Sequence, residues 1–154
     1  METAGRSGQR TGSLDEIAEA LPQRASMLSR VFLSRASVQI SRTELGVLWA
    51  LSRRPRRITE LAARDCISQP GITRLVDRLE CRGWVSREPD PADRRGVLVA
   101  LTAQGASTFD RLRDEYRAVM HEEMATLADD DVRTLSDAIA ILDRLLERLT
   151  GQEP

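Results

Sequence analysis

Residues 60–80, "ELAARDCISQPGITRLVDRLE", decide the fold of this 154-residue chain. They hold a short amphipathic run, a turn, and a longer run that Ser68 can cap. Pro70 falls in the first turn of the longer run, where a missing amide proton costs little, and Gly83 ends that run as a C-cap glycine. The apolar side of the longer run consists of Leu75, Val76 and Leu79. This spacing predicts a helix-turn-helix of the DNA-binding kind.

A β-hairpin is predicted directly after these helices. Residues 84–90, "WVSREPD", and 96–102, "GVLVALT", have the period-two pattern of two strands of a hairpin. Asp90, Pro91 and Gly96 shape the turn that joins them. A helix-turn-helix followed by a hairpin is a winged helix, so we expect residues 41–102 to form a winged helix-turn-helix domain.

Helices are predicted at the N-terminal side of this domain. Residues 1–12 are rich in Gly, Ser and Arg, and we expect a disordered tail there. Ser13 and the residues after it form a capping box that opens a helix over 13–40, which Pro22 should kink or restart. Ser41 opens the next helix, and Thr59 is expected to cap the short helix of the helix-turn-helix.

Two long helices are predicted over residues 103–150. Thr102 caps the first, which we expect to run to about Leu127, and Asp129 lies at the start of the second. The last helix has a continuous apolar seam, which is typical of a helix that packs against another. The fold class predicted is therefore mainly α with a small β-hairpin wing, flanked by N- and C-terminal dimerisation helices.

The composition is that of a soluble globular domain, with 41% hydrophobic and 31% charged residues. No apolar run approaches the roughly 18 residues that span a membrane, and the N-terminus has no apolar stretch of a secretory signal. We expect a cytoplasmic, nucleoid-associated protein with no membrane partner.

The net charge of −1 conceals an uneven distribution. Every cationic side chain is Arg; residues 42–103 hold 12 Arg against 8 Asp and Glu, a net +4, and residues 104–154 hold 6 against 12, a net −6. Arg offers a rigid fork for phosphates and guanine edges. The basic segment 42–103 and the acidic segment 104–154 predict two different functions on one chain. Nucleic-acid binding is the function predicted for the basic segment.

The chain resembles the MarR family of bacterial transcriptional regulators from about Leu14 to Leu149. The motifs that support the resemblance, in order and spacing, are "SQPGITRLVDRLE" (68–80), "RGWV" (82–85), "DPADRR" (90–95) and "LTAQG" (101–105). "LGVLWAL" (45–51) and the two long C-terminal helices also fit. The resemblance implies an obligate homodimer with its interface in the terminal helices. It also implies a recognition helix in the major groove and an Arg of the wing in the minor groove.

The predicted recognition helix has polar side chains on its N-terminal, outward side. Gln69 and Arg74 have the groups that hydrogen-bond adenine and guanine edges. Ser68 and Thr73 can contact phosphates or bases, and Arg78, one turn later, is expected to meet the DNA backbone. The predicted contact residues of this helix are Ser68, Gln69, Pro70, Thr73, Arg74 and Arg78. The alternative is that these are ordinary solvated residues of a surface helix.

The wing tip is the second predicted contact. Arg94 and Arg95 form its cationic point, and a narrow A·T-rich minor groove attracts Arg by its negative potential. Asp93 can hold the guanidinium of Arg95, and the resemblance assigns these two residues the same roles. The alternative is that these charged residues form a solvated turn with no binding role. Residues 53–57, "RRPRR", either touch flanking phosphates without sequence preference or form a solvated loop.

A small-molecule pocket is implied by the resemblance, between the dimer helices and the winged helix. Leu28, Phe32, Trp49 and Tyr116 could line it by pattern. Plain core packing explains the same residues equally well. The sequence names no ligand.

The two cysteines and the single histidine are weaker candidates. We expect Cys66 to be buried in the turn before the recognition helix and Cys81 to be exposed near that helix's end. Twelve residues of helix span about 18 Å, far more than the roughly 7 Å between the Cα atoms of a disulfide, so no intrachain bridge is expected. His121 lies among glutamates but lacks further ligands, so no metal site is expected.

The sequence therefore predicts a homodimeric, sequence-specific DNA-binding regulator with a double-stranded, pseudo-palindromic operator. A ligand-responsive repressor is the favoured form, with half-sites about 10 bp apart or a multiple of that. No catalytic residue and no cofactor is expected, because the chain has no phosphate loop and no visible nucleophile–base motif. The alternatives are a thiol sensor that acts through Cys81, a winged-helix module for protein–protein interaction, or a domain of an enzyme.

Overall fold

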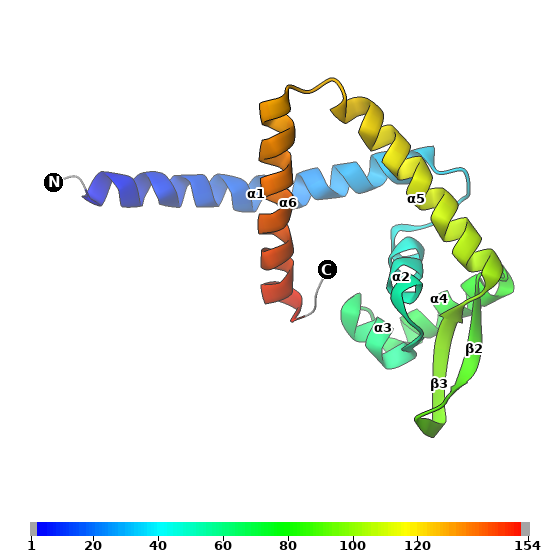
Figure 1. Cartoon of the computed structure of the whole chain (residues 1–154). Helices are drawn as coiled ribbons and strands as arrows, with labels where there is room; N and C mark the ends of the chain where they lie inside the picture. Colours follow the sequence, from blue (N-terminus) through cyan, green and yellow to red (C-terminus); the bar gives the residue numbers. More distant parts are fainter. Residues whose placement is uncertain (1–2, 152–154) are drawn as a thin grey trace. The chain divides into compact units, whose positions relative to one another are not determined.

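Figure 1 shows the computed structural model, which describes the backbone of residues 3–151 and the side chains of residues 12–93 and 96–151. The chain forms two compact units, residues 1–42 and 43–154. The elements follow in the order α1 (Thr3–Arg35), α2 (Arg42–Arg53), β1 (Arg56–Arg57), α3 (Ile58–Arg64), α4 (Gln69–Cys81), β2 (Val85–Asp90), β3 (Asp93–Leu101), α5 (Ala103–Met124) and α6 (Asp129–Thr150). The fold is mainly helical with one small sheet, which confirms the predicted fold class.

Helix α1 is longer at its start and shorter at its end than predicted. It begins at Thr3, so the disordered tail expected over residues 1–12 is wrong for residues 3–12, and Ser13 lies inside the helix rather than at its cap. Residues 3–12 contain no proline, and extending an existing helix adds one hydrogen bond per residue without a new nucleus. Pro22 lies within α1, and the helix ends at Arg35 rather than near residue 40.

The first helix of the helix-turn-helix, α3, begins at Ile58, before the residue predicted to cap it. Helix α2 starts directly after Ser41, as predicted. Helix α3 starts directly after Arg57, which has extended backbone and no side-chain cap, so the predicted cap at Thr59 is wrong. The reason is that Arg57 ends a strand, and the chain passes from that strand into the helix without a loop.

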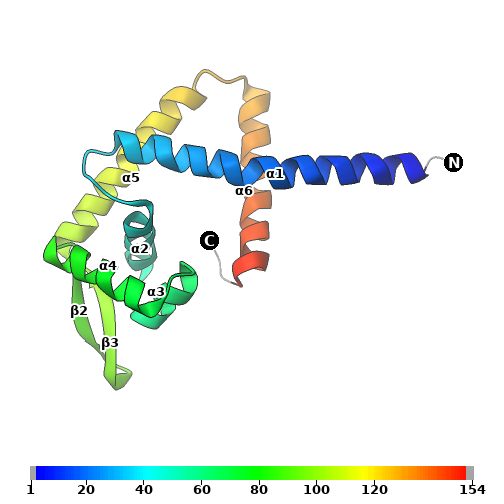
Figure 2. The same ribbon diagram turned by 180° about the vertical axis from the view of Figure 1, so that it is seen from behind.

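The sheet contains one strand more than the predicted hairpin. Its order is β1-β3-β2 and both pairings are antiparallel. Strand β1 is only two residues long, too short to show an alternating pattern, and its Arg57 pairs with Leu98. Figures 1 and 2 show β2 and β3 as a ribbon that extends past α4. The register shifts between Pro89 and Asp90, just before the tip.

The core of the second unit lies where α2, α3, α4, the sheet and the first half of α5 contribute side chains. Gly105, in the first turn of α5, is needed because a Cβ there would lie 1.8 Å from the carbonyl oxygen of Trp84. This close approach brings the start of α5 against the start of the wing. The largest fully buried side chains are Leu48, Leu61, Ile72, Leu79, Leu112, Val47, Val76 and Val99.

Helix α6, all of which lies within the described residues, has no buried residue. Three Asp occupy its first turn, where carboxylates favour the positive end of the helix dipole, and Gly151 follows it with φ of +65°. Its apolar side chains are 42–75% exposed where they are most open: Val132, Leu135, Ile139, Ile141, Leu145, Leu146 and Leu149. A helix with one apolar side that its own unit leaves exposed is typical of a helix that packs against a partner.

Candidate nucleic-acid interface

The N-terminus of α4 is built by Ser68. Its Oγ accepts a hydrogen bond from the backbone N–H of Gly71 at 3.3 Å, and Pro70 occupies the first turn, as the sequence predicted. At the other end, Gly83 has φ of +72°, which confirms the predicted C-cap glycine. The helix is therefore fixed at both ends, and at its start the amide protons of Gly71 and Ile72 are bound by Ser68.

The outward side of α4 holds the residues predicted to contact DNA. Gln69, Pro70 and Arg74 are exposed, whereas Thr73 is half-buried and donates its hydroxyl proton to the carbonyl oxygen of Gln69 at 2.9 Å. The opposite side of the helix, formed by Ile72, Leu75, Val76 and Leu79, is buried in the core. Burial of one side presents the amide and guanidinium groups of the other side to solvent.

Arg78 is exposed one turn further along α4. Its Nε lies 3.6 Å from Oε1 of Glu44 on α2, and its Nη1 donates to the carbonyl oxygen of Arg74 at 3.3 Å. Because the Arg78 side chain is 59% exposed, the ion pair with Glu44 leaves part of the guanidinium open to solvent. The predicted contact of Arg78 with the DNA backbone stays a prediction.

Arg87 joins the wing to α4. Its Nη2 lies 2.6 Å from Oδ1 of Asp77, and its Nη1 donates to Glu80. Sequence reasoning did not single out Arg87. The signal was present, since Arg87 lies two residues after buried Val85 and therefore shares the face of β2 that looks toward α4.

The wing turn is organised by Asp90, whose side chain is only 7% exposed. Its Oδ1 accepts the backbone N–H of Ala92 at 2.8 Å, and its Oδ2 accepts Nε and Nη2 of Arg57 at 2.8 and 2.5 Å. The Ala92 amide and the Arg57 guanidinium together lower the pKa of Asp90. The same hydrogen bond to Asp90 raises the pKa of Arg57.

The predicted tip residues lie beside this turn. Arg94 and Arg95 belong to β3, but their side chains lie outside the described part of the chain. The exposed Asp93 has its Oδ2 3.4 Å from Nη2 of Arg57. The predicted pairing of Asp93 with Arg95, and the contact of the tip with DNA, stay predictions.

Three arginines of residues 53–57, namely Arg54, Arg56 and Arg57, fold back onto the protein. Arg54 forms an ion pair with Glu60 at 2.8 Å. Arg56 donates from Nε to the carbonyl oxygen of Ala50 at 3.1 Å, and its burial lowers its pKa. With Arg57 bound to the wing, this segment is neither a plain solvated loop nor a free set of cations. The predicted contact of this segment with flanking phosphates stays a prediction.

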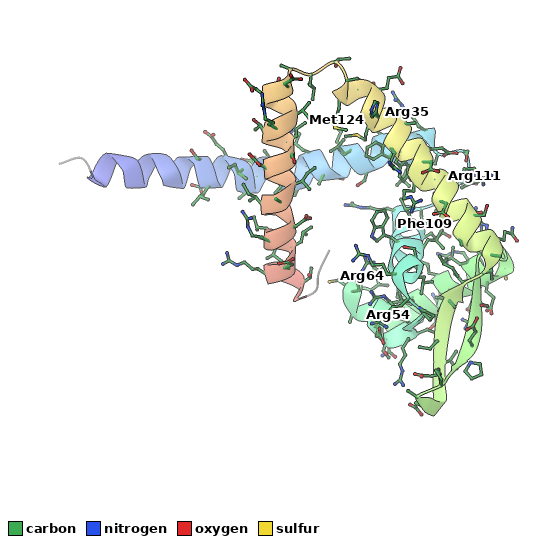
Figure 3. All side chains as sticks on the ribbon, viewed as in Figure 1. Arg35, Arg54, Arg64, Phe109, Arg111 and Met124 are labelled. Atoms are coloured by element: carbon green, nitrogen blue, oxygen red, sulfur yellow. The ribbon has the colours of Figure 1, made fainter. Side chains whose placement is uncertain are left out.

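The predicted pocket residues fall in both units. Trp49 on α2 meets Phe109 on α5 edge-on with ring centroids 5.5 Å apart, and Trp49 is 42% exposed (Phe109 is labelled in Figure 3). Tyr116 is half-buried, and burial raises the pKa of its phenol. Leu28 and Phe32 lie on α1, in the other unit. The pocket stays a prediction.

Both cysteines are exposed and free. The expectation that Cys66 is buried is wrong: the residue is exposed, and its φ of +52° places it in a left-handed turn between the two helices. The exposure predicted for Cys81 is confirmed. His121 is exposed on α5, and across the described residues no three His, Cys, Asp or Glu side chains lie close enough to hold a metal ion.

No helix within residues 3–151 has both the length and the apolar character needed to cross a membrane.

Comparison with known proteins agrees with this geometry. The model of the MarR family matches residues 40–97, which include all of α2, α3, α4 and β2. The multiple antibiotic resistance protein MarR of Escherichia coli is 45% identical over 65 residues, a match that covers 42% of this chain and 45% of that protein. The HTH-type transcriptional repressor NicR of Pseudomonas putida is 31% identical over 99 residues, covering 64% of this chain and 59% of the relative. The chain thus matches about half the length of these curated relatives.

Among solved structures, wild-type MarR of Escherichia coli in its apo form superposes with a TM-score of 0.68 at 30% identity. That match covers 84% of this chain and 96% of the other, so it extends well beyond the winged helix. Members of this family are transcriptional regulators that bind DNA, not enzymes. The capped α4, the wing and these likenesses lead to one conclusion: the chain belongs to the MarR family of transcriptional regulators.

Proposed function

We propose that the protein is a homodimeric repressor that binds a pseudo-palindromic operator through α4 and the wing. The exposed side of α4 is the observation that supports this most directly, because Gln69 and Arg74 stand in solvent beside a capped helix N-terminus. Those two side chains have the donors and acceptors that distinguish bases in the major groove. The Pseudomonas putida relative is named a repressor.

Each predicted contact has a defined part in this proposal. Gln69 and Arg74 read base edges, while Ser68, Pro70 and Thr73 fit the start of α4 against a phosphate or a neighbouring base. Three residues of the wing and one of α4 complete the interface. Arg78 meets the DNA backbone, Arg95 enters a minor groove with Asp93 holding it, and Arg94 lies beside them.

The proposed homodimer rests on the exposed apolar side of α6. Val132, Leu135, Ile139, Leu142, Leu146 and Leu149 recur at alternating spacings of three and four residues. This is the seam of a helix that packs along another. Soluble monomers rarely leave such an apolar stripe in water. A two-fold axis between two copies then requires two related half-sites about 10 bp apart or a multiple of that.

Induction by a small molecule follows if a ligand changes the spacing of the two recognition helices. Trp49, 42% exposed beside Phe109, and half-buried Tyr116 provide aromatic surface for it on the second unit. A ligand can shift the balance only by its differential affinity for the two forms.

Selection from random duplexes, followed by binding measured across a salt series, tests the proposal. We expect one pseudo-palindromic sequence, bound by two chains, about 10³-fold or more tighter than scrambled duplex. A reporter driven by a promoter with that site should fall in output when the protein is supplied. Binding that is weak, sequence-blind and lost with salt would contradict the proposal.

A thiol-sensing mode is a second candidate, favoured by the exposure of Cys81 at the end of α4. Oxidant should then release wild-type protein from the selected duplex but leave the Cys81→Ser variant bound. If both proteins respond equally, Cys81 is not the sensor.

A further inference from the structure

A buried carboxylate fixes the turn of the wing. Asp90 ends β2, and its two oxygens have different tasks: Oδ1 accepts the Ala92 amide inside the turn, and Oδ2 accepts two N–H groups of Arg57. A Cβ on Gly96 would lie 2.9 Å from the Cβ of Asp90 and 3.2 Å from Oδ2. The turn is therefore closely packed around this one side chain.

Arg57 connects that turn to the helix-turn-helix. It is the last residue of β1 and the N-cap residue of α3, 33 positions before Asp90 in the chain. Its backbone pairs with Leu98 in the central strand, so its side chain starts from a fixed position in the sheet. The ion pair with Asp90 thus links the first helix of the DNA-binding motif to the tip of the hairpin.

The wing engages two of the three guanidinium nitrogens of Arg57, whose side chain is 41% exposed. Nε and Nη2 both donate to Asp90, and Nη2 also lies 3.4 Å from Oδ2 of Asp93. If the same groups contacted a phosphate, they would leave the buried carboxylate of Asp90. The negative charge of Asp90 would then lose the hydrogen bonds that offset its burial. We propose that Arg57 is a positioning residue for DNA binding: through Asp90 it holds the wing turn in the orientation that presents Arg95.

The physical benefit is a smaller ordering cost on binding. A free hairpin tip samples many conformations, and DNA must select one of them. A turn held by Asp90 and Arg57 has given up most of that freedom before it meets the groove. This proposal rests on the proposed function, since it assumes that the wing binds DNA, and it assigns Arg57 an indirect part in that binding.

A double-mutant cycle on the selected duplex separates positioning from direct contact. The proteins are wild type, Arg57→Ala, Arg95→Ala and the double variant. We expect Arg57→Ala to weaken binding about 10-fold in the wild-type background and less than about 2-fold once Arg95 is removed, because its effect passes through the wing. Equal losses in both backgrounds, with the salt slope reduced by about 1, would show a phosphate contact and overturn the proposal.

Arg54→Ala is the matched control. Arg54 lies in the same cationic segment but pairs with Glu60 rather than with the wing. Its substitution should have the same small effect in both backgrounds.

Asp90→Asn is the second test of the ion pair between Arg57 and Asp90, because it keeps the size of the side chain and removes its charge. It should repeat the non-additivity with Arg95→Ala, and it replaces Arg57→Ala in the cycle if that variant fails to fold.

Hydrogen exchange gives a readout that needs no DNA. In Arg57→Ala the amides of residues 92–96 should exchange about 10-fold faster while those of α4 keep their rates, and Arg57→Lys should restore part of the protection. Unchanged exchange at the tip would overturn the proposal.

If wild type binds no specific duplex, the proposed function fails and the positioning role with it. If wild type binds specifically but the cycle is additive, only the positioning role fails.

Discussion

The hydroxyl of Thr102 lies 2.6 Å from the carbonyl oxygen of Gly83 and donates a hydrogen bond to it. The same Oγ1 accepts the backbone N–H of Gly105 at 3.0 Å, which caps α5. One side chain therefore joins the end of the recognition helix segment to the start of α5. Strands β2 and β3 of the wing lie in the chain between Gly83 and Thr102, so the hydrogen bond between these two residues joins the two ends of the wing.

Replacing Thr102 by alanine should lower the free energy of unfolding by about 2 kcal/mol, because the helix loses its cap and the Gly83 carbonyl loses its donor. Equilibrium urea denaturation at fixed protein concentration measures this. Thr134→Ala is the control: Thr134 is exposed on α6 and bonds only to the carbonyl oxygen of Asp130, one turn earlier. It should cost less than about 0.5 kcal/mol. Equal effects of the two substitutions would contradict the role of Thr102.

Arg74→Ala should weaken binding to the selected duplex by about 1–3 kcal/mol and relax the preference at one base pair in each half-site. Arg111→Ala is the control, since Arg111 is an exposed arginine on α5 (Figure 3). It should change affinity by less than about 0.5 kcal/mol. Fluorescence anisotropy with a panel of single-base variants of the duplex measures both. A loss that is uniform across the panel would mean that Arg74 meets only the backbone.

Ile139→Glu should weaken the proposed homodimer. Ile139 lies in the middle of the apolar seam of α6, and two copies would each place a carboxylate in the interface. We expect the dimer dissociation constant to rise at least about 100-fold. Sedimentation velocity over a concentration series measures it. Ala140→Glu adds the same charge one residue away, off the seam, and should leave the dimer intact; dissociation by both variants would indicate a charge effect rather than a seam.

The ion pair of Asp90 predicts a pH dependence with a defined sign. Hydrogen bonds from Ala92 and Arg57 lower the folded-state pKa of Asp90 below the unfolded value of about 3.9. The unfolded state then binds the proton first, so the stabilisation is present above a pH of about 4 and is lost as the pH falls through the folded pKa. Between pH 6 and 3, the midpoint of urea unfolding should fall further for wild type than for Asp90→Asn. Parallel curves would contradict the pairing.

The local parts of the fold were predictable from the sequence. The capping hydrogen bonds of Ser68 and Thr102 and the left-handed turn at Gly83 lie within a few residues of these positions, so short patterns identify them. The wing was recognisable because apolar runs on both sides of a turn-forming Asp-Pro segment are typical of a hairpin. Strand β1 was missed because two residues show no period, and pairing with Leu98 depends on a strand about forty positions away.

The connections between elements were not predictable in the same way. Arg57 bonds to a carboxylate 33 positions later, and only the folded sheet brings the two together. Cys66 was expected to be buried on the basis of its place in the turn, but it lies exposed in a turn with left-handed backbone. In both cases the sequence shows which chemical groups are present, and the backbone geometry decides what they face.

The central claim is that α4 and the wing together bind a specific duplex, and hydroxyl-radical footprinting on the selected duplex tests it most directly. The account predicts two protected half-sites related by a two-fold axis, about 10 bp apart or a multiple of that, each with a flanking minor-groove protection that disappears in Arg95→Ala. A continuous protection without symmetry, identical in wild type and Arg95→Ala and abolished by moderate salt, would contradict it.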